Sequence, residues 1–212
     1  MHNELGFLRS ALVCDILDAL GLHFQAFRPD IAALEQGTRL IGRAFTVSAM
    51  EVDEEPAMRY VGLLKALDAV TAGDVVVLAS GRTERSAMWG ELLSNSCSTR
   101  GALGTVTDGY ARDTAQTREL GYPLFARGSL PLDIHGRCEV VGHGQPVVID
   151  QVVISPGDLI VADDDGVAVV PATIVSSVVE QAAIKADGEN SFRDAVRGGL
   201  SASEAFDRFG VL

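Results

Sequence analysis

The chain has 212 residues, 47% of them hydrophobic and 22% charged, which are the proportions of a globular protein able to bury a sizeable core. Its 17 Lys and Arg residues against 29 Asp and Glu residues give a formal net charge of −12, which repels nucleic acid phosphates. The apolar runs fall far short of the ~20 residues of a membrane helix. The N-terminus lacks a secretory pattern. We therefore expect a soluble, cytoplasmic single domain over 1–212, with a core over about 8–172 and a helical tail over 173–212, that binds no nucleic acid and no membrane.

The first 128 residues alternate between helical and strand patterns. Helices are recognised by apolar residues at spacings of three and four, and strands by alternating or continuous β-branched residues. In chain order the patterns predict a helix over 8–20, a strand near 40–50, a helix over 56–70, a strand over 74–81, a helix over 86–101, a strand over 102–109, a helix over 111–121 and a strand over 122–128. This alternation predicts an α/β fold with several parallel neighbouring strands.

The sequence changes in character from residue 129, where Gly, Pro and Asp divide short β runs. This pattern predicts an antiparallel β layer joined by tight turns. Three consecutive acids, Asp163–Asp165, precede Gly166 and favour a β-turn over a cation site, because successive residues cannot all face one ion. The tail is predicted to be helical with a break around Asp187 and Gly188.

The three cysteines, Cys14, Cys97 and Cys138, are an odd number at wide spacing. That spacing suits neither a disulfide framework nor a thiolate metal site. Cys97 falls within a predicted helix with no histidine nearby in sequence, which favours a buried thiol over a nucleophile. We expect the three residues to be buried free thiols.

The motif DGYARD, residues 108–113, ends a predicted strand in a glycine turn that is followed by Arg112 and Asp113. One interpretation is local: Asp108 and Gly109 form the turn, and Asp113 stabilises the first turn of a helix. The other is chemical: Arg112 binds a carboxylate through two hydrogen bonds, and Asp113 gives a hard oxygen ligand to Mg²⁺ or Mn²⁺. Local pattern alone favours the first interpretation.

The motif WGELL, residues 89–93, follows the stretch ASGRTERSAM and stands where a helix N-terminus is expected. Backbone N–H groups at such an end attract anions, and Gly90 lets a ligand approach the backbone closely. Glu91 has two interpretations, either a first-turn carboxylate stabilised by the helix dipole or a member of a site.

Six segments, in one order, carry a resemblance to a known family. They are CDILDALG, LIGRAFTV, GDVVVLASG, WGELLSNSCSTRGALGTVTDGYARD, ELGYPLFARG and VISPGDLIVADDDGVAVVP. Over roughly residues 10–172, and in the tail SASEAFDRFGVL, the chain resembles the 4-hydroxy-4-methyl-2-oxoglutarate aldolase and regulator-of-ribonuclease-activity family. Several linked motifs in one order are far more specific than any single motif.

The resemblance implies a fold, an assembly and an activity. The fold would be a compact layered α/β sandwich of the swivelling phosphohistidine-domain type, with a mixed sheet and a C-terminal helical tail. Members assemble as homotrimers or homohexamers with sites at subunit interfaces. The aldolases are Mg²⁺- or Mn²⁺-dependent lyases that cleave 4-hydroxy-4-methyl-2-oxoglutarate or 4-carboxy-4-hydroxy-2-oxoadipate to pyruvate and a second keto acid, and many also decarboxylate oxaloacetate.

The resemblance also implies roles for particular residues. Arg112 would bind the substrate carboxylate, and Asp113 would anchor the metal. The pyruvyl end would be held by the backbone of four consecutive residues, Gly90, Glu91, Leu92 and Leu93. In the aldolases an acid stands twenty residues before the Arg-Asp pair, and here Glu91 takes that place with one methylene more than the usual Asp. A neighbouring subunit's C-terminal region adds a further acid, for which Glu189 is the candidate.

Two other functions compete with the lyase. The ribonuclease-regulating branch of the family tends to lose the acid after the arginine, whereas this chain keeps Asp113, which favours metal chemistry over a non-catalytic protein-binding regulator. A methyltransferase is the third interpretation. The sequence has no recognisable glycine-rich cofactor loop after its first strand, which argues against that activity.

Overall fold

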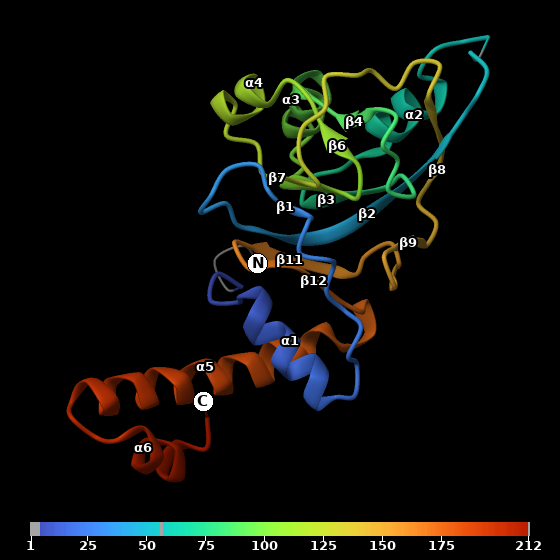
Figure 1. The fold of residues 1–212 in the computed structure, drawn as a ribbon. Helices are drawn as coiled ribbons and strands as arrows, with labels where there is room; N and C mark the ends of the chain where they lie inside the picture. The colour runs from blue at the N-terminus through green and yellow to red at the C-terminus, as the bar shows by residue number, and fades with distance from the viewer. Residues whose placement is uncertain (1–4, 56, 212) are drawn as a thin grey trace.

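A mixed eight-stranded sheet forms the centre of the computed structural model, which describes residues 5–55 and 57–211 (Figure 1). The strand order is β1-β7-β5-β3-β2-β11-β12, and β8 also pairs with β2. The strands of the described ranges are β1 (Ala32–Ala33), β2 (Leu40–Glu51), β3 (Asp74–Ala79), β4 (Ala87–Trp89), β5 (Gly104–Thr107), β6 (Tyr110–Ala111), β7 (Leu124–Ala126), β8 (Cys138–His143), β9 (Val147–Ile149), β10 (Val152–Ile154), β11 (Leu159–Asp163) and β12 (Gly166–Val170).

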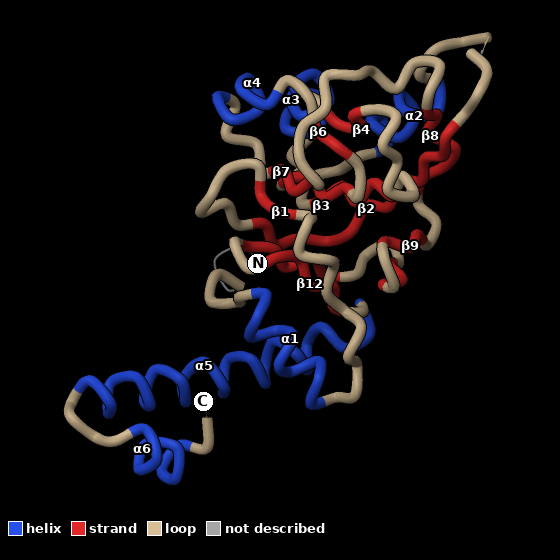
Figure 2. Tube along the Cα trace, viewed as in Figure 1, coloured by secondary structure: helices blue, strands red, loops and turns tan. Residues whose placement is uncertain are grey.

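Helices lie on both sides of this sheet. They are α1 (Ser10–Ala19), α2 (Val61–Ala69), α3 (Glu91–Thr99), α4 (Thr114–Glu119), the 3₁₀ turn η1 (Ala172–Ile174), α5 (Val175–Arg197) and α6 (Ala202–Phe209). Helices α2, α3 and α4 lie on one side, whereas α1 and α5 lie on the other, next to β11 and β12 (Figures 1 and 2). In the part of the chain that the structure describes, no helix has both the length and the apolar character needed to cross a membrane.

The 12-residue strand β2 joins a parallel half of the sheet to an antiparallel half. Along one edge it pairs in parallel with β3, and parallel pairing continues through β5 to β7. Along the other edge it pairs antiparallel with β11 and β8. The antiparallel pairing predicted after residue 129 is thus confirmed. Strands β8, β11 and β12 belong to the main sheet, whereas, among the described strands, β9 and β10 pair only with each other.

The sheet is nearly closed by the segment that precedes β1. The N–H of Phe27 donates to the carbonyl of Val167 on β12 at 3.0 Å, and the N–H of Val169 donates to the carbonyl of Gln25 at 2.8 Å. The chain then continues into β1, which pairs with β7 at the far end of the strand order. Apolar side chains from several strands fill the enclosed space, Phe125 and Ile149 being completely buried there. The expected α/β class with a mixed sheet and a C-terminal helix is confirmed.

The helix predicted over 8–20 is α1, and it shows why the apolar spacing predicted it. Val13 and Leu17, four residues apart, are completely buried against β11, β12 and α5. Burial of side chains of this size contributes roughly 1.5–3 kcal/mol each. The β-turn predicted at Asp163–Asp165 is also confirmed, since β11 and β12 pair in register around it.

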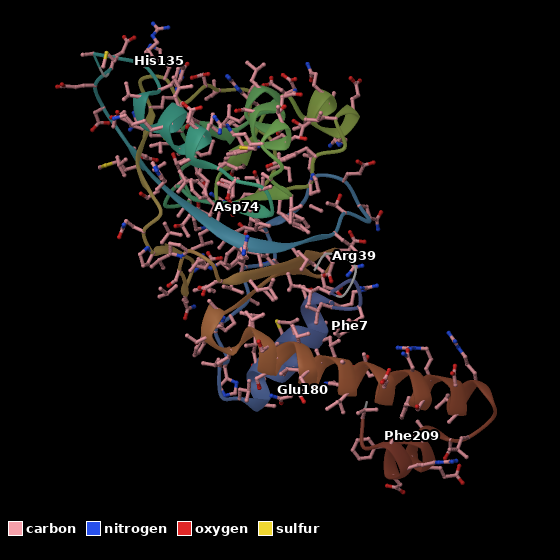
Figure 3. All side chains as sticks on the ribbon, turned by 180° about the vertical axis from the view of Figure 1, so that it is seen from behind. Phe7, Arg39, Asp74, His135, Glu180 and Phe209 are labelled. Atoms are coloured by element: carbon pink, nitrogen blue, oxygen red, sulfur yellow. The ribbon has the colours of Figure 1, made fainter. Side chains whose placement is uncertain are left out.

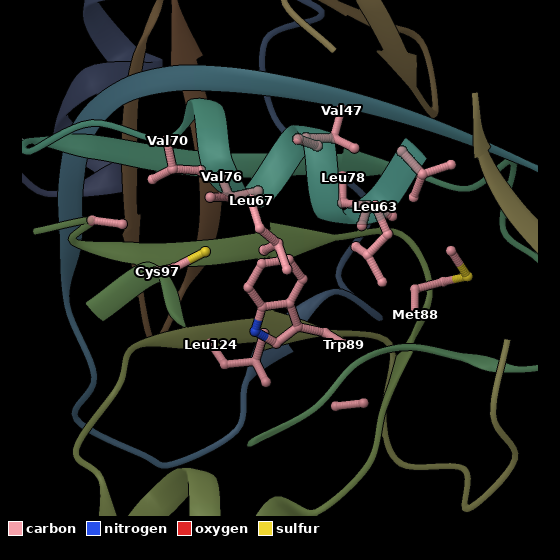
Figure 4. Packing of buried hydrophobic residues seen from close by; sticks show 14 of the residues in the cluster. Val47, Leu63, Leu67, Val70, Val76, Leu78, Met88, Trp89, Cys97 and Leu124 are labelled. Carbon is pink, nitrogen blue, oxygen red and sulfur yellow. The ribbon is translucent and has the colours of Figure 1, made fainter. Parts of the chain in front are cut away.

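The segment predicted as one helix over 86–101 is a short strand followed by a helix. Strand β4 pairs in parallel with β6, and the carbonyl of Trp89 accepts the N–H of Arg112 at 2.8 Å. That pairing occupies backbone groups that a helix would need, so α3 begins only at Glu91. Trp89 therefore lies on a strand rather than on the apolar face of a helix, and Figure 4 shows it packed beneath Leu67 of α2.

The break predicted around Asp187 and Gly188 is wrong, because α5 continues as one helix of 23 residues. Gly188 serves close packing instead: an added Cβ would lie 3.3 Å from a methyl carbon of Val211, which follows α6. The helix ends instead at Arg197, before the pair Gly198 and Gly199. Gly199 has a φ of +100°, a conformation that favours glycine. Beyond the sheet, α5 and α6 project as an arm, and Phe209 lies at the opposite end of the molecule from His135 (Figure 3).

Candidate functional site

The chain segments that follow three neighbouring parallel strands converge beside the main sheet. Strand β4 follows β3, β6 follows β5, and the segment around Ser129 follows β7; these segments pair with one another in parallel. The N–H of Ala87 donates to the carbonyl of Leu132 at 2.8 Å, which extends this backbone network. Ligands of α/β proteins commonly bind beyond the carboxyl ends of parallel strands. Gly90, Arg112 and Asp133 are brought together at that edge.

Asp108 holds the ends of two parallel strands together. Its carboxylate accepts hydrogen bonds from the N–H and hydroxyl of Ser80, at 2.6 and 2.7 Å, and from the N–H of Arg82 at 3.0 Å. Next to it, Gly109 allows Met88 to pack closely, since an added Cβ would lie 2.5 Å from the Met88 Cγ. The local interpretation of Asp108 and Gly109 as turn residues is therefore supported by their contacts.

Arg112 lies between two carboxylates. Its Nη1 is 2.7 Å from Oδ2 of Asp133, and its Nε is 3.5 Å from Oδ2 of Asp113. About a third of the Arg112 side chain remains exposed (32%). Within residues 5–55 and 57–211, no side chain pairs with Nη2, so the guanidinium keeps donors for a further carboxylate.

Gly90 brings the start of α3 against this pair. As the N-cap of α3 it stands where a side chain would collide with the site: an added Cβ would lie 2.8 Å from Oδ2 of Asp113 and 3.1 Å from Cγ of Arg112. The first N–H groups of a helix have no carbonyl partner within the helix and carry partial positive charge. The sequence prediction that WGELL opens a helix is confirmed, and that helix end faces Arg112 and Asp113.

Asp113 does not serve the local role that its position first suggests. It is the N-cap residue of α4 with a left-handed φ of 53°, yet its side chain accepts no capping hydrogen bond. The carboxylate is 41% exposed, and Arg112 is its only polar contact in the described part of the chain. Asp tolerates a left-handed conformation better than most residues, but the geometry is sparsely populated. The backbone thus presents this carboxylate to solvent beside α3.

Two further candidates lie apart from that pair in the single chain. Glu91 hydrogen-bonds through Oε1 with the side-chain amide of Asn95, one turn along α3. Glu189 lies on α5, which Figure 1 shows on the opposite side of the sheet from α3 and α4. Leu92 and Leu93 continue α3 from Glu91, as predicted, and line the pocket described below.

Two residues at the site were missed by the sequence analysis, Asp133 and Tyr60. Asp133 accepts the Tyr60 hydroxyl at 3.0 Å and the N–H of His135 at 2.7 Å through Oδ1, while Oδ2 faces Arg112. Partial burial raises the pKa of the Asp133 carboxyl, but these donors and Arg112 outweigh it and hold that pKa below its usual value. Burial, followed by the Asp133 contact, raises the pKa of Tyr60. The one sequence feature that could have pointed to Asp133 was its position in the segment after the strand β7.

A pocket of about 390 Å³ opens beside Arg112. Its lining residues come from α2 and the residue before it, from β4, α3 and the segment after β6, and from the loop that carries Asp133: Tyr60, Leu63, Leu64, Leu67, Ala87, Met88, Trp89, Gly90, Leu92, Leu93, Ser96, Arg112, Asp133 and Ile134. Volumes of about 300–1,000 Å³ are typical of small-molecule sites. The site therefore combines a charged edge with a largely apolar hollow.

The oxygen donors at this edge are compatible with one bound Mg²⁺. Within the described ranges, no three His, Cys, Asp or Glu side chains lie close enough together to bind a metal ion on their own. Mg²⁺ commonly uses one or two carboxylates and completes its octahedron with water and substrate oxygens. Asp113 suits that role, because its carboxylate is accessible and is not engaged by backbone N–H groups.

The cysteines lie away from this chemistry. Cys97 and Cys138 are buried, and Cys14 is half-buried, so the prediction of free thiols holds while Cys14 is less enclosed than expected. Burial raises the pKa of Cys97 to about 12, which leaves it as the unreactive thiol at neutral pH.

Known proteins resemble this chain over most of its length. DlpA of Legionella pneumophila is 29% identical over 196 residues, which are 92% of this chain but 31% of DlpA, so the chain spans about a third of that relative. The 4-hydroxy-4-methyl-2-oxoglutarate aldolase of Thermus thermophilus is 30% identical over 135 residues, 63% of this chain and 76% of the aldolase. The crystal structure of Streptomyces coelicolor RraAS2, described as an unusual member of the RNase ES inhibitor RraA protein family, superposes with a TM-score of 0.80 at 28% identity, over 93% of this chain and 96% of RraAS2.

A protein-family model matches residues 10–169 and is described as RraA-like, Aldolase/RraA. That range contains Gly90, Arg112, Asp113 and Asp133, and it ends before α5. The match covers most of the chain and agrees with the resemblance carried by the sequence motifs. The chain belongs to the RraA-like family.

Proposed function

We propose that the protein is a divalent-metal-dependent lyase that cleaves 4-hydroxy-4-methyl-2-oxoglutarate, or a related 4-hydroxy-2-oxo acid, and releases pyruvate. The observation that carries this proposal is the placement of Arg112 and Asp113 against the start of α3, where Gly90 leaves room for a ligand. The similarity to an aldolase of that name supports the same reaction class.

The carboxylate of a 2-oxo acid would bind at the charged edge. The guanidinium of Arg112 offers Nη2 and its remaining N–H groups, and the N–H groups of Glu91, Leu92 and Leu93 point from the start of α3. Together they would neutralise the carboxylate and fix the position of the pyruvyl part. Positioning of this kind contributes strongly to catalysis, because it converts binding into a reactive geometry.

Asp113 would hold the divalent ion, Mg²⁺ or Mn²⁺, together with oxygen atoms of the substrate and water. When bound, such an ion supplies Lewis-acid stabilisation of negative charge on the keto oxygen. This chemistry requires no Schiff-base lysine. Lys185 is unsuited to that role, because it pairs with Asp15 at 2.5 Å on the α1 side of the sheet.

The bond change is a retro-aldol cleavage. A base removes the proton from the C4 hydroxyl, the C3–C4 bond breaks as C4 becomes a carbonyl, and the electron pair on C3 is protonated to give pyruvate. We assign the orientation of that base to Glu91, the first residue of α3, which would exchange its hydrogen bond with Asn95 for one to the base. Decarboxylation of oxaloacetate forms the same enolate, so we expect it as a side activity.

We further propose that the protein acts as a homotrimer or homohexamer. Glu189 would then come from the arm of a neighbouring subunit and add a carboxylate beside Asp113. The position of Glu189 on the arm formed by α5 and α6 is what makes this addition possible, because that part of α5 extends past its own sheet.

A coupled pyruvate assay tests the lyase. Purified protein with Mg²⁺ or Mn²⁺ should release pyruvate from 4-hydroxy-4-methyl-2-oxoglutarate and from oxaloacetate, and a chelator should abolish the release until metal is restored. Activity that survives complete chelation would overturn the metal assignment. If no pyruvate is released from either substrate with either metal, the assignment as a lyase is wrong.

A second candidate function is a non-catalytic regulator that binds a ribonuclease. The similarity to RraAS2 favours it, because that protein belongs to a family of ribonuclease inhibitors. The Arg112→Ala variant distinguishes the two functions. If the protein is a regulator, this variant should still inhibit the ribonuclease. If it is a lyase, the same variant should lose pyruvate release.

A further inference from the structure

We infer that Asp133 is a positioning residue for Arg112, and that Tyr60 positions Asp133 in turn. Through these contacts the guanidinium of Arg112 is aimed at the substrate carboxylate and kept away from Asp113. The inference rests on the proposed function for the identity of the ligand, a 2-oxo acid. Its structural basis is a series of contacts that runs from the start of α2 to the edge of the pocket.

The carboxylate of Asp133 is held in one orientation by two donors. Its Oδ1 accepts the N–H of His135 at 2.7 Å and the Tyr60 hydroxyl at 3.0 Å, which leaves Oδ2 to form the ion pair with Nη1 of Arg112 at 2.7 Å. Because both donors act on the same oxygen, the direction of the other oxygen is fixed independently of Arg112. An acid supported in this way orients its partner better than a mobile surface acid does.

Tyr60 adopts a backbone conformation that large side chains rarely take. Its φ of 61° and ψ of 17° are left-handed, which is an outlier for a bulky residue. The carbonyl of Tyr60 accepts the N–H of Leu64 at 2.8 Å, so the strained residue is the N-cap of α2. A glycine would meet this backbone requirement without strain. What tyrosine adds is the hydroxyl that reaches Asp133 and a ring that lines the pocket.

Arg112 has two acidic partners in the described part of the chain, and they have opposite consequences. Nη1 is 2.7 Å from Asp133, whereas Nε is 3.5 Å from Asp113. Without the charge of Asp133, Asp113 is the remaining acid beside the guanidinium, and Coulomb attraction draws Arg112 toward it. An arginine paired closely with Asp113 covers the carboxylate assigned to the metal and turns its own donors from the ligand. Asp133 therefore keeps the cation and the metal-binding carboxylate available at the same time.

Binding of pyruvate in Mg²⁺ tests this role in the full-length protein without turnover. Trp89 is the only tryptophan of the chain and lines the pocket, so its fluorescence reports binding, and calorimetry measures the same Kd. Asp133→Asn keeps an oxygen that accepts from Tyr60 and His135 but removes the charge that faces Arg112. The Kd for pyruvate should therefore rise about tenfold or more in this variant.

The matched control is Asp68→Asn. Asp68 of α2 pairs with Arg100 at 2.8 Å, at the end of α3, and lies outside the pocket lining. The substitution removes the same charge from a similar ion pair, and its Kd should stay within about twofold of the wild type. Equal Kd values for folded Asp133→Asn and Asp68→Asn would overturn the inference.

Tyr60→Phe separates position from charge, because it removes the hydroxyl and keeps both the ring and the net charge. It should raise the Kd about threefold in the wild type, the effect of one lost hydrogen bond. It should leave the Kd of Asp133→Asn unchanged, since Tyr60 acts through the Asp133 charge. A loss of equal size in both backgrounds would overturn the chain of contacts. An unchanged Kd in folded Tyr60→Phe would do the same, even if Asp133→Asn did not fold.

Failure of the proposed function would look different from failure of this inference. If the variants followed the expected order of Kd values while no 4-hydroxy-2-oxo acid or oxaloacetate released pyruvate, the positioning role would hold at a binding site and the lyase would be wrong. If the wild type released pyruvate while Asp133→Asn bound it normally, the lyase would hold and the positioning role would be wrong. Absence of pyruvate binding by the wild type would also overturn the inference, because Arg112 would have no carboxylate to receive.

Discussion

Aspartates in the two halves of the sheet have different surroundings. In the antiparallel half, Asp163 accepts the N–H of Ser10 at 2.8 Å and is buried, and Asp164 beside it accepts the N–H of Gly37 at 2.8 Å. In the parallel half, the Asp113 side chain makes no capping hydrogen bond, and its carboxylate has Arg112 as its only polar contact among the described residues. The acids of the antiparallel half hold backbone in place, whereas Asp113 keeps its oxygen atoms available.

The difference follows from how the strands are connected. Antiparallel β11 and β12 need only a tight turn, whose acids bond to nearby backbone. Parallel β3 and β5 need crossovers, and the segments after them form the β4–β6 pair that carries Gly90 and Arg112. Long crossovers therefore give the parallel half room for side chains that are not needed to close a turn.

The largest effect that would test this comparison is on catalysis. Asp113→Asn should lower metal-dependent pyruvate release by about 10³-fold or more, because a metal ligand supports several kcal/mol of charge stabilisation. Its matched control is Asp164→Asn, an exposed aspartate of the antiparallel turn that should stay within about twofold of the wild type. Steady-state kinetics with oxaloacetate would measure both. If both variants lost pyruvate release to a similar extent, the proposed difference between Asp113 and the aspartates of the antiparallel turn would be wrong.

A smaller effect, on stability, should appear in the other half. Asp163→Ala leaves the buried N–H and hydroxyl of Ser10 without their acceptor, so the free energy of unfolding should fall by about 1–3 kcal/mol. Pyruvate release by the folded protein should be retained. Asp165→Ala, at an exposed position of the same turn, serves as the control and should change stability by less than about 0.5 kcal/mol. Urea unfolding measures the difference, and equal stabilities of the two variants would contradict the assigned role of Asp163.

The smallest predicted effect depends on pH. Because the fold holds the pKa of Asp133 below its unfolded value of about 3.9, its ionised form stabilises the protein above that value. That contribution is lost as the pH falls through the lower folded pKa. The Tm difference between the wild type and Asp133→Asn should therefore be constant from about pH 7 to 5 and shrink below about pH 4. A difference that grows on acidification would have the wrong sign for a lowered pKa.

Features that depend on neighbouring residues in sequence were predictable. Gly90 before an apolar helix predicted the start of α3, and Asp165-Gly166 predicted the turn between β11 and β12. Both are set by backbone conformation over a few residues. Gly188 led to the wrong prediction of a helix break because that prediction used only neighbouring residues. The local pattern cannot distinguish a helix break from a glycine that accommodates a distant residue such as Val211.

The contact between Tyr60 and Asp133 at the site could not be predicted from local sequence. Tyr60 and Asp133 are separated by 73 residues and meet only because α2 and the loop after β7 lie at the same edge of the sheet. Arg112 and Asp113 could be named from the family resemblance, but the Asp133 partner of Arg112 came from three-dimensional structure. The roles of Glu91 and Glu189 stay predictions, because their positions in one chain do not test them.

The absence of a side chain at Gly90 also limits which sequences can replace this one. Every single-nucleotide change that alters a glycine codon to another amino acid adds a Cβ, and at this position that atom would lie 2.8 Å from the carboxylate of Asp113. No mutational step through a smaller residue exists. We therefore expect replacements of Gly90 to be depleted in a deep mutational scan selected for pyruvate release, because they displace the Asp113 carboxylate, whereas the codons for the exposed leucines Leu64 and Leu92 should accept many replacements.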